Sequence, residues 1–501
     1  MKSIKNKSVS RRKFLQASST AAVAAPFLNC GGIKVPHLMK RTFGKLNFPV
    51  TTFGLGGQAS IQWTPDDVDP VKIILKAFDS GVNYYDTSNV YGPSQMNYGK
   101  AFRELHLIPG RPGYDESLRR SIFLTSKTLL RWAKGGWEND DIRSVTNGPE
   151  GSKTLDDVRR TLSQIYGNGN GNYPQGAYID MVLIHTLTTL PEVEALYEGL
   201  DNPDPKAENI GALAALRDVR DGTNRTGLNP KEEKLIRHIG FSGHSSAPVM
   251  MEMIRRDTDN ILDGMLIAIN ANDRLNLNMQ YNVIPVAHAK NMGIIAMKAF
   301  ADGAMYTKEA TWSREPKHVV RTVGSSTLPS RPLVEYSLTT PGIHTAIIGI
   351  GQISGTDAEC QLVNNIASAQ VNPDGLSERD RREIENMTRS IKDGKTNYFQ
   401  IAEGGLTPPR KIAAEQEMLN GRRSVKLTWH TAYAGDEPLA HYEIIRDNTK
   451  IVEISHRPQT TNEPFAFEDI VDGKGAHNYK IAAVDSIGRS ASSEEIAVEN
   501  V

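Results

Sequence analysis

Between about residues 40 and 395, short apolar runs alternate with segments of helical periodicity, and this alternation restricts the fold more than any other feature of the chain. The runs are nearly continuous in apolar residues, as expected of parallel strands that are buried on both faces. The segments between them, such as DPVKIILKAFDSG, space apolar residues three and four positions apart and close on a glycine, as amphipathic helices do. The predicted strands are 50–56, 81–86, 121–127, 178–185, 236–243, 261–270, 293–298 and 342–351.

Eight strand–helix units in succession predict an α/β fold, a (β/α)8 TIM barrel over 40–395, rather than an open doubly wound sheet. The first strand–helix turn has no GxGxxG motif, which also disfavours a Rossmann fold. After a predicted linker at 396–405, the pattern changes to short runs that alternate with period two and are separated by turn residues. Residues 406–501 therefore predict a small all-β sandwich.

The sandwich region is similar to a fibronectin type III domain. Trp429, Tyr442 and Tyr479 stand at the positions of its core aromatics. Such domains often serve as spacers, or attach enzymes to other molecules. The resemblance therefore implies a polysaccharide or protein partner for this part of the chain.

The N-terminal segment has the pattern of a targeting signal. The letters SRRKFL (10–15) precede an apolar run, 17–28, that is too short to span a bilayer. Residues 1–30 resemble a twin-arginine signal peptide. This implies the Tat export machinery as a partner, a periplasmic or otherwise extracytoplasmic location, and no stable transmembrane anchor. The twin-arginine route carries folded proteins, often with a cofactor already bound.

Charge and cysteine content exclude several classes of protein. Lys+Arg and Asp+Glu both total 58, so the chain lacks the excess of positive charge that is typical of nucleic-acid-binding proteins. Of the two cysteines, Cys30 is expected to be lost in processing, which leaves Cys360 alone. We therefore expect neither a disulfide framework nor a metal site.

Three predicted strands end in reactive polar groups, and in such barrels the chemistry lies at the C-terminal ends of the strands. The second strand brings Asp86 and Tyr91 to this rim, the third brings Lys127 and the fourth brings His185. Any one of these is usually a solvated loop residue. The four together predict a catalytic site.

These four side chains suit proton transfer to a carbonyl oxygen. A phenol with a pKa near ~10 is a poor acid at neutral pH, and a nearby ammonium is expected to lower that pKa. A carboxylate can fix the lysine, and an imidazole can orient the substrate oxygen. Charge develops on that oxygen when a hydride attacks the carbonyl carbon. None of the four carries a hydride, so a cofactor is implied.

Residues 40–395 resemble the aldo-keto reductase family in NYYDTSNVYG, FLTSK, DMVLIH and IRHIGFSGHS, and in three later strand segments. The resemblance implies an NAD(P)-dependent oxidoreductase that acts on a small carbonyl or alcohol substrate (an aldehyde, ketone or sugar). It makes Tyr91 the proton donor, general acid in one direction and base in the other. Lys127 tunes Tyr91, Asp86 holds Lys127, and His185 orients the carbonyl.

The resemblance also implies a cofactor, NADP or NAD, extended across the barrel rim. Its expected contacts are Ser242, His244, Asn270, Gly303, Gly349, Gly351, Gln361 and Asn365. Leu266 and Ile269 stand where many relatives have a glutamine and a tyrosine. Gln361 stands where an arginine often binds the 2′-phosphate. This replacement slightly favours NAD, because a neutral amide cannot form charged, bidentate hydrogen bonds with a phosphate. His244 either replaces a carboxamide contact or is a solvated turn residue.

Two functions stay open on the sequence. The complete catalytic set favours an exported oxidoreductase that keeps its cofactor during export, with 298–317 as a closing loop. The missing nicotinamide contacts, and scarce cofactor outside the cytoplasm, favour a non-catalytic carbohydrate- or partner-binding protein. In the insertion 129–153, Trp132 and Trp137 either line the substrate cleft or pack the long loop on the barrel.

Overall fold

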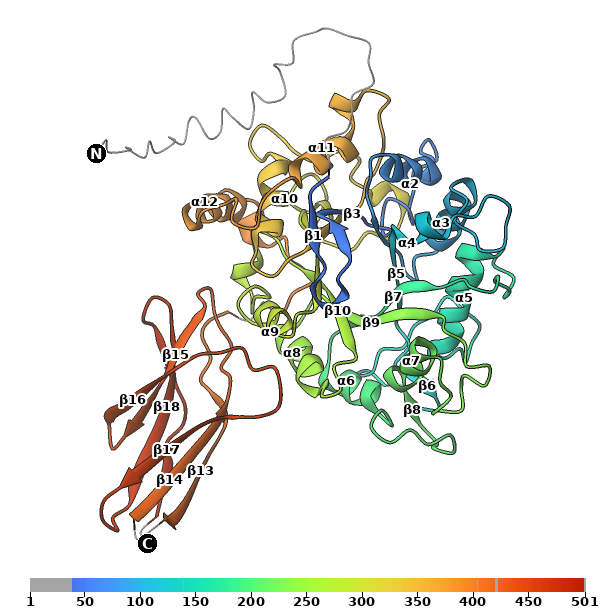
Figure 1. Cartoon of the computed structure of the whole chain (residues 1–501). Helices are drawn as coiled ribbons and strands as arrows, with labels where there is room; N and C mark the ends of the chain where they lie inside the picture. The colour runs from blue at the N-terminus through green and yellow to red at the C-terminus, as the bar shows by residue number, and fades with distance from the viewer. Residues whose placement is uncertain (1–37, 138, 403, 420–421, 500–501) are drawn as a thin grey trace, which may run out of the picture.

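The computed structural model describes residues 38–137, 139–402, 404–419 and 422–499 (Figure 1). The twin-arginine segment expected over 1–30 lies outside these residues. Across the described ranges, no helix combines the length and the apolar character that a membrane crossing needs.

Eight parallel strands close into a barrel, which confirms the predicted fold class. The ring closes where the last strand pairs with the first, with Ala346 opposite Phe53. In chain order the barrel strands are β3 (Phe53–Leu55), β4 (Tyr84–Asp86), β5 (Phe123–Thr128), β7 (Ile179–Leu187), β9 (Ile236–Gly243), β10 (Leu262–Ala268), β11 (Gly293–Met297) and β12 (Thr345–Ile348). Two short antiparallel pairs lie outside the ring: β1 (Lys40–Thr42) with β2 (Pro49–Thr51), and β6 (Trp132–Lys134) with β8 (Ile210–Gly211).

Helices surround the barrel (Figure 1). They are α2 (Pro70–Asp79), α3 (Ser94–Glu104), α4 (Glu116–Arg120), α5 (Thr154–Tyr166), α6 (Leu190–Tyr197), α7 (Ala212–Asp221), α8 (Ala247–Arg256), α9 (Val283–Ala289), α10 (Ser330–Thr339), α11 (Gln361–Ser368) and α12 (Glu378–Arg389). Short 3-10 turns are η1 (Gly44–Leu46), η2 (Asp273–Leu275), η3 (Ala301–Gly303), η4 (Pro316–His318), η5 (Asp357–Glu359) and η6 (Lys392–Gly394).

Helix α2 illustrates how the sequence sets this outer layer. The Asp69 carboxylate accepts a hydrogen bond from Val71 N at 2.9 Å and caps the helix, and Pro70 occupies its first position. The buried stripe consists of Val71, Ile73, Ile74 and Ala77. Gly81, at φ 83°, follows the helix and turns the chain toward β4.

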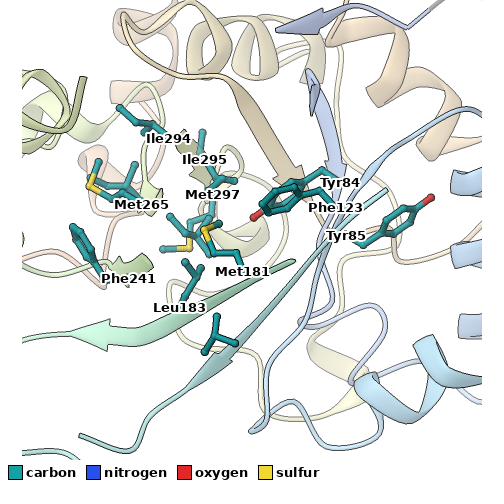
Figure 2. Close-up of a cluster of buried hydrophobic side chains, with 14 of the residues drawn as sticks. Tyr84, Tyr85, Phe123, Met181, Leu183, Phe241, Met265, Ile294, Ile295 and Met297 are labelled. Atoms are coloured by element: carbon teal, nitrogen blue, oxygen red, sulfur yellow. The ribbon is translucent and has the colours of Figure 1, made fainter. Parts of the chain in front are cut away.

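Large side chains fill the barrel beneath the rim (Figure 2). Tyr84 stacks on Phe123 with ring centroids 5.8 Å apart. Tyr85, the next residue of β4, points the other way and meets Tyr98 of α3 edge-on at 6.1 Å. Because side chains alternate along a strand, Asp86 shares the inward direction of Tyr84. The interior is a packed core, so the chemistry is confined to the rim.

The C-terminal domain consists of two antiparallel sheets, as the sandwich prediction requires. One sheet holds β13 (Arg410–Leu419), β14 (Arg422–His430) and β17 (Phe465–Val471); the other holds β15 (Leu439–Arg446), β16 (Thr449–Ser455), β18 (His477–Asp485), β19 (Ser490–Ser492) and β20 (Ile496–Val498). Trp429, Tyr442 and Tyr479 are buried in one core cluster, and Trp429 stacks on Phe465. This core is separate from that of the barrel.

The segment expected to be a linker, 396–405, differs from that expectation in its first half. Thr396 accepts a hydrogen bond from Asn272 at 2.8 Å, and Gln400 donates one to Asp273 at 2.7 Å. All four side chains are buried. The chain between β10 and α9 carries buried amide and carboxyl groups that need partners, and this segment provides them.

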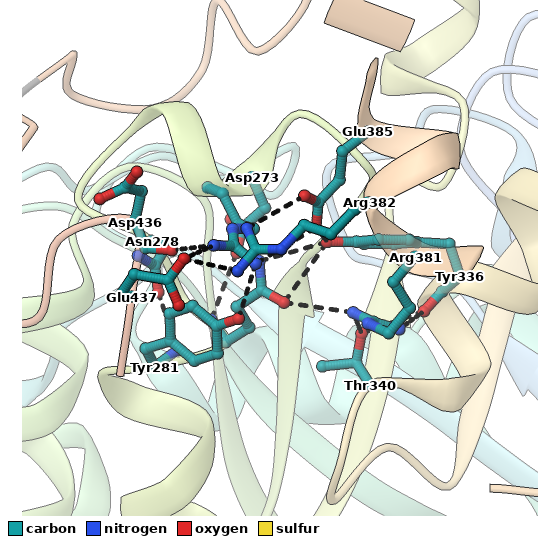
Figure 3. Close-up of polar contacts among 12 residues, drawn as sticks. Asp273, Asn278, Tyr281, Tyr336, Thr340, Arg381, Arg382, Glu385, Asp436 and Glu437 are labelled. Carbon is teal, nitrogen blue, oxygen red and sulfur yellow. Dashed lines mark hydrogen bonds and ion pairs between the residues drawn. The ribbon is translucent and has the colours of Figure 1, made fainter. Parts of the chain in front are cut away.

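The sandwich contacts the same part of the barrel through its loop 434–437 (Figure 3). Arg274, with a side chain only 3% exposed, pairs with Glu437 at 2.8 Å. Asn282 exchanges two hydrogen bonds with the backbone of Ala434, at 2.9 and 3.1 Å. Arg382 of α12 adds a second ion pair to Glu437. The two domains are therefore joined mainly by polar contacts.

Candidate active site

The four predicted catalytic side chains lie together at the rim and are buried. Lys127 Nζ donates to Asp86 Oδ1 at 2.5 Å and to the carbonyl oxygen of Thr87 at 2.8 Å. The same ammonium lies 3.5 Å from Tyr91 Oη. On the other side of the phenol, His185 Nε2 lies 3.3 Å from Tyr91 Oη. Tyr91 is thus the centre of the group.

A tight turn after β4 positions Tyr91. Thr87 N and Asn89 N donate to the carbonyl oxygens of Thr125 and Lys127, so the backbone stays tied to β5 beyond the strand. Tyr91 N then donates to the carbonyl oxygen of Ser88 at 3.1 Å, which closes the turn. The polar residues between Asp86 and Tyr91 therefore form the turn that positions the phenol at the opening of the barrel.

Burial raises the pKa of Tyr91 well above its usual value of 10, and the charges of Asp86 and Asp302 act in the same direction. This is the opposite of the lowering that we expected from Lys127. Desolvation of a phenolate outweighs the ammonium because Lys127 is already neutralised by Asp86. Burial also raises the pKa of Asp86 and lowers that of Lys127, each opposed by the charge of the other. Tyr91 is accordingly a neutral phenol that retains its proton.

His185 is neutral as well. Burial, and then the charge of Lys127, lower its pKa well below the usual 6.5. Its Nδ1 lies 3.2 Å from Ser88 Oγ. Arg131 holds the backbone here, because its Nη2 donates to the carbonyl oxygens of His185 and Thr186 at 2.9 and 3.0 Å. Arg131 in turn pairs with Glu192 at 3.0 Å, and both side chains are fully buried.

A narrow cavity extends from the catalytic group to α11, lined by Asp86, Tyr91 and Gln361 among others. Of the expected cofactor contacts, four line it: Gly303, Gly349, Gly351 and Gln361. Asn365 lies one helical turn beyond Gln361. Within the described ranges, Gln361 Oε1 and both amide atoms of Asn365 are buried without a hydrogen-bond partner. Orphaned polar atoms of this kind fit a polar ligand along this face of α11.

The other three expected contacts lie elsewhere. Ser242 Oγ accepts a hydrogen bond from Thr186 N at 3.0 Å and supports the strand end. The amide of Asn270 donates to Lys298 O and Asn397 Oδ1, so its role here is to join loops. His244 is buried, not solvated, and lines the neighbouring cleft. Of the two positions that depart from the family pattern, Leu266 lines the narrow cavity, and Ile269 is fully buried outside its lining.

The expected closing loop, 298–317, lines the narrow cavity through Lys298 and Gly303 among others, and the segment after it adds Val320. Gly303 has φ 86°, and a Cβ there would lie 2.4 Å from Val320 Cγ2. A Cβ on Gly351 would lie 2.6 Å from the carbonyl oxygen of Val320. Next to Val320, Arg321 pairs with Asp67 at 2.7 Å. The cavity volume is about 130 Å³, below the roughly 300–1,000 Å³ of ordinary ligand pockets. Val320 thus packs closely against two glycines of the cavity lining.

A wider cleft of about 700 Å³ adjoins the narrow cavity, and Tyr91 lines both. Aromatic side chains that the sequence reasoning missed form its walls, namely Trp63, Trp312, Tyr398 and Phe399. Two of them lie in the segment expected to be a linker. Adjacent aromatic residues are unusual in a solvated linker. Their presence in the sequence could have indicated that this segment packs against the barrel.

Trp132 and Trp137 do not line the cleft. Trp132 is 2% exposed, and its ring centroid lies 4.6 Å from that of Trp137. Trp132 Nε1 also donates to the carbonyl oxygen of Trp137 at 2.9 Å. Of the two roles left open, Trp132 has the loop-packing one, whereas Trp137 is 50% exposed outside the cleft.

Comparison with known proteins gives one family. Residues 52–323 match the model of the Aldo/keto reductase family. No curated protein matches the chain.

Similar solved structures include an aldo-keto reductase described as putative from Pseudomonas aeruginosa (21% identity, 66% of this chain and 94% of that chain, TM-score 0.40). An aldo-keto reductase from Klebsiella pneumoniae, solved with NADPH, is 16% identical over 70% of this chain and 95% of that chain, with a TM-score of 0.41. An aldo-keto reductase from Bombyx mori, solved with NADP, is 16% identical over 69% and 91%, with a TM-score of 0.39.

Proposed function

The chain belongs to the aldo/keto reductase family, and from this premise we propose that it is an NAD(P)-dependent oxidoreductase that interconverts a carbonyl and an alcohol. One observation carries the proposal: Tyr91 borders both the narrow cavity and the wide cleft. A nicotinamide in the first and a carbonyl in the second would meet at its hydroxyl. Lys127 and His185 flank that same atom.

The narrow cavity fits a nicotinamide dinucleotide in its polar groups. The unpartnered atoms of Gln361 and Asn365 would bind the adenosine end. Lys298, whose side chain is 6% exposed, lines the cavity and suits the phosphates. Gln361 carries no charge for a 2′-phosphate, so we favour NAD over NADP.

When bound, the nicotinamide supplies or accepts the hydride. The neutral imidazole of His185 holds the carbonyl oxygen near Tyr91 Oη. Tyr91 donates its proton to that oxygen as negative charge develops there. The high pKa of Tyr91 makes the bare phenolate unfavourable, and the Lys127 ammonium at 3.5 Å stabilises it at that moment. Asp86 keeps Lys127 charged and fixed. In the oxidative direction Tyr91 Oη accepts the proton back from the substrate oxygen.

The test is to mix purified protein with NADH or NADPH and a panel of aldehydes, ketones and sugars, and to follow cofactor absorbance. We expect turnover by the natural chain and almost none by Tyr91→Phe. Tryptophan fluorescence quenching reports cofactor binding independently. Binding of neither cofactor would instead favour the non-catalytic binding protein.

The twin-arginine pattern at 10–15 supports export. We place the protein in the periplasm or an equivalent compartment, carried there folded by the Tat machinery with its cofactor. The close packing of Val320 against Gly303 and Gly351 supports slow release, and a retained cofactor would be recycled in place by a second substrate. Mass spectrometry of protein purified from the periplasm without added cofactor tests this. Near-stoichiometric nicotinamide dinucleotide is expected, and its absence would contradict retention. The sandwich would attach the enzyme to a polysaccharide or protein partner.

A further inference from the structure

The wide cleft carries an imbalance of charge. Two arginines, Arg143 and Arg314, line it, and no carboxylate is among its described lining residues. They come from different loops, one between β6 and α5 and the other after η3. Across the described ranges, neither guanidinium has a carboxylate within ion-pair distance.

The carboxylates of Glu192, Glu315 and Asp302 are already engaged. Glu192 accepts hydrogen bonds from Arg131, from Thr188 and from the backbone N–H of Arg143. Glu315 pairs with Lys317 at 2.9 Å. Asp302 pairs with Lys308 at 2.7 Å. The positive charge of Arg143 and Arg314 therefore remains available to a molecule in the cleft.

The backbone of Arg143 is tied to the catalytic group, whereas its side chain is exposed. Its backbone N–H donates to Glu192 Oε1 at 3.2 Å. Glu192 holds Arg131, and Arg131 holds the carbonyl oxygen of His185. A short chain of buried and partly buried polar contacts thus ties the backbone of Arg143 to the histidine that would orient the substrate. In agreement with this proximity, the charge of Arg143 contributes to lowering the pKa of both His185 and His244.

The other residues of the cleft indicate the chemistry of the rest of the substrate. Trp63, Trp312 and Phe399 offer flat apolar faces, and Gln58, Gln62 and Thr188 offer hydrogen bonds between them. Aromatic faces interleaved with amide and hydroxyl groups suit a hydroxylated ring or chain. A planar guanidinium suits a carboxylate, which it grips through two parallel hydrogen bonds.

We propose that the substrate is a carbonyl compound that carries a carboxylate, of the sugar-acid type, and that Arg143 binds this carboxylate while the carbonyl lies at Tyr91. The proposal rests on the oxidoreductase function above and names its substrate class. Arg143 acts in binding and specificity, and it takes no part in proton transfer.

The experiment compares matched acidic and neutral substrates: glucuronate with glucose, and 4-carboxybenzaldehyde with 4-methylbenzaldehyde. We expect kcat/KM of the natural protein to favour the acid in each pair by at least ~10-fold, the effect of about 1.4 kcal/mol. Arg143→Gln should bring each ratio close to one by raising KM of the acid, with kcat and the neutral substrates nearly unchanged. Arg111→Gln, which removes an equal charge from an exposed loop outside the cleft, should leave the ratios as they are.

Failure of this inference can be told apart from failure of the function. Equal turnover of acid and neutral partners, unaltered in Arg143→Gln, would overturn the acidic substrate and leave the oxidoreductase intact. An acid preference that Arg143→Gln retains would overturn the role of Arg143. No turnover of any substrate, with no binding of NADH or NADPH, would overturn the proposed function and the inference with it.

Discussion

Tyr91 Oη lies 3.3 Å from His185 Nε2, although the two residues are 94 positions apart in the chain. Tyr91 comes from the loop after β4 and His185 from β7, and β5 with Lys127 lies between those strands. The contact exists because three neighbouring parallel strands present their C-terminal ends at one rim. The first three predictions concern this group.

Tyr91→Phe should reduce kcat by at least ~100-fold, the lower limit for general acid catalysis. Only the hydroxyl is removed, so cofactor binding measured by tryptophan quenching should stay nearly constant. Steady-state kinetics on any accepted carbonyl provides the measurement. Near-normal turnover in this variant would remove Tyr91 from the mechanism.

The pH dependence of reduction follows from the directions of two pKa values. The pKa of His185 lies well below 6.5, so the imidazole stays neutral as the pH falls through the weakly acidic range. The pKa of Tyr91 lies well above 10, so its proton is lost only at strongly alkaline pH. We expect kcat for reduction to be flat between these limits. An inflection near pH 6.5 would show that His185 titrates normally, against its buried position.

Arg131→Met should disturb His185 without touching substrate. Glu192 would be left buried and unpaired, a change that costs about 3–5 kcal/mol of unfolding free energy. The double variant Arg131→Met/Glu192→Leu removes both charges, so it should recover much of that stability. We expect kcat to remain low in both variants because the carbonyl oxygens of His185 and Thr186 lose their donor. Full recovery of kcat in the double variant would make the role of Arg131 purely structural.

Gly303→Ala should accelerate release of the cofactor. The new Cβ would meet Val320 at 2.4 Å on a backbone with φ 86°, so the closing segment must shift. Arg321→Ala removes only the exposed pair with Asp67 and should have a smaller effect. Stopped-flow fluorescence gives the dissociation rates. Unchanged release in Gly303→Ala would mean that this segment does not retain the cofactor.

Truncation after residue 405 should leave a folded barrel, because the two hydrophobic cores are separate. Activity on small carbonyls should persist, whereas attachment to a polymer or partner should weaken. The matched cut after residue 395 also removes Tyr398 and Phe399, together with partners of Asn272 and Asp273. It should lose substrate binding and stability, as circular dichroism and kinetics can measure. Insoluble protein from the first cut would show that the sandwich completes the barrel.

The sequence alone determined the architecture and the identity of the central group. Parallel strands buried on both faces must be apolar, so β4, β5 and β7 are recognisable in the sequence as apolar runs. The polar residues at the ends of these runs are then recognisable as exceptions to the pattern. The barrel topology then brings Asp86, Tyr91, Lys127 and His185 to one edge without further information. The period-two pattern likewise predicted the buried Trp429 of the sandwich.

Only the tertiary structure decided how these groups are tuned and what surrounds them. The pKa of Tyr91 depends on how completely the barrel removes water from it, and no sequence pattern records that burial. Tyr398 and Phe399 meet Trp312 at the cleft although more than 80 residues of chain intervene. Arg143 and Arg314 converge in the same way from separate loops. Period and composition describe neighbours along the chain, whereas desolvation and charge pairing depend on neighbours in space.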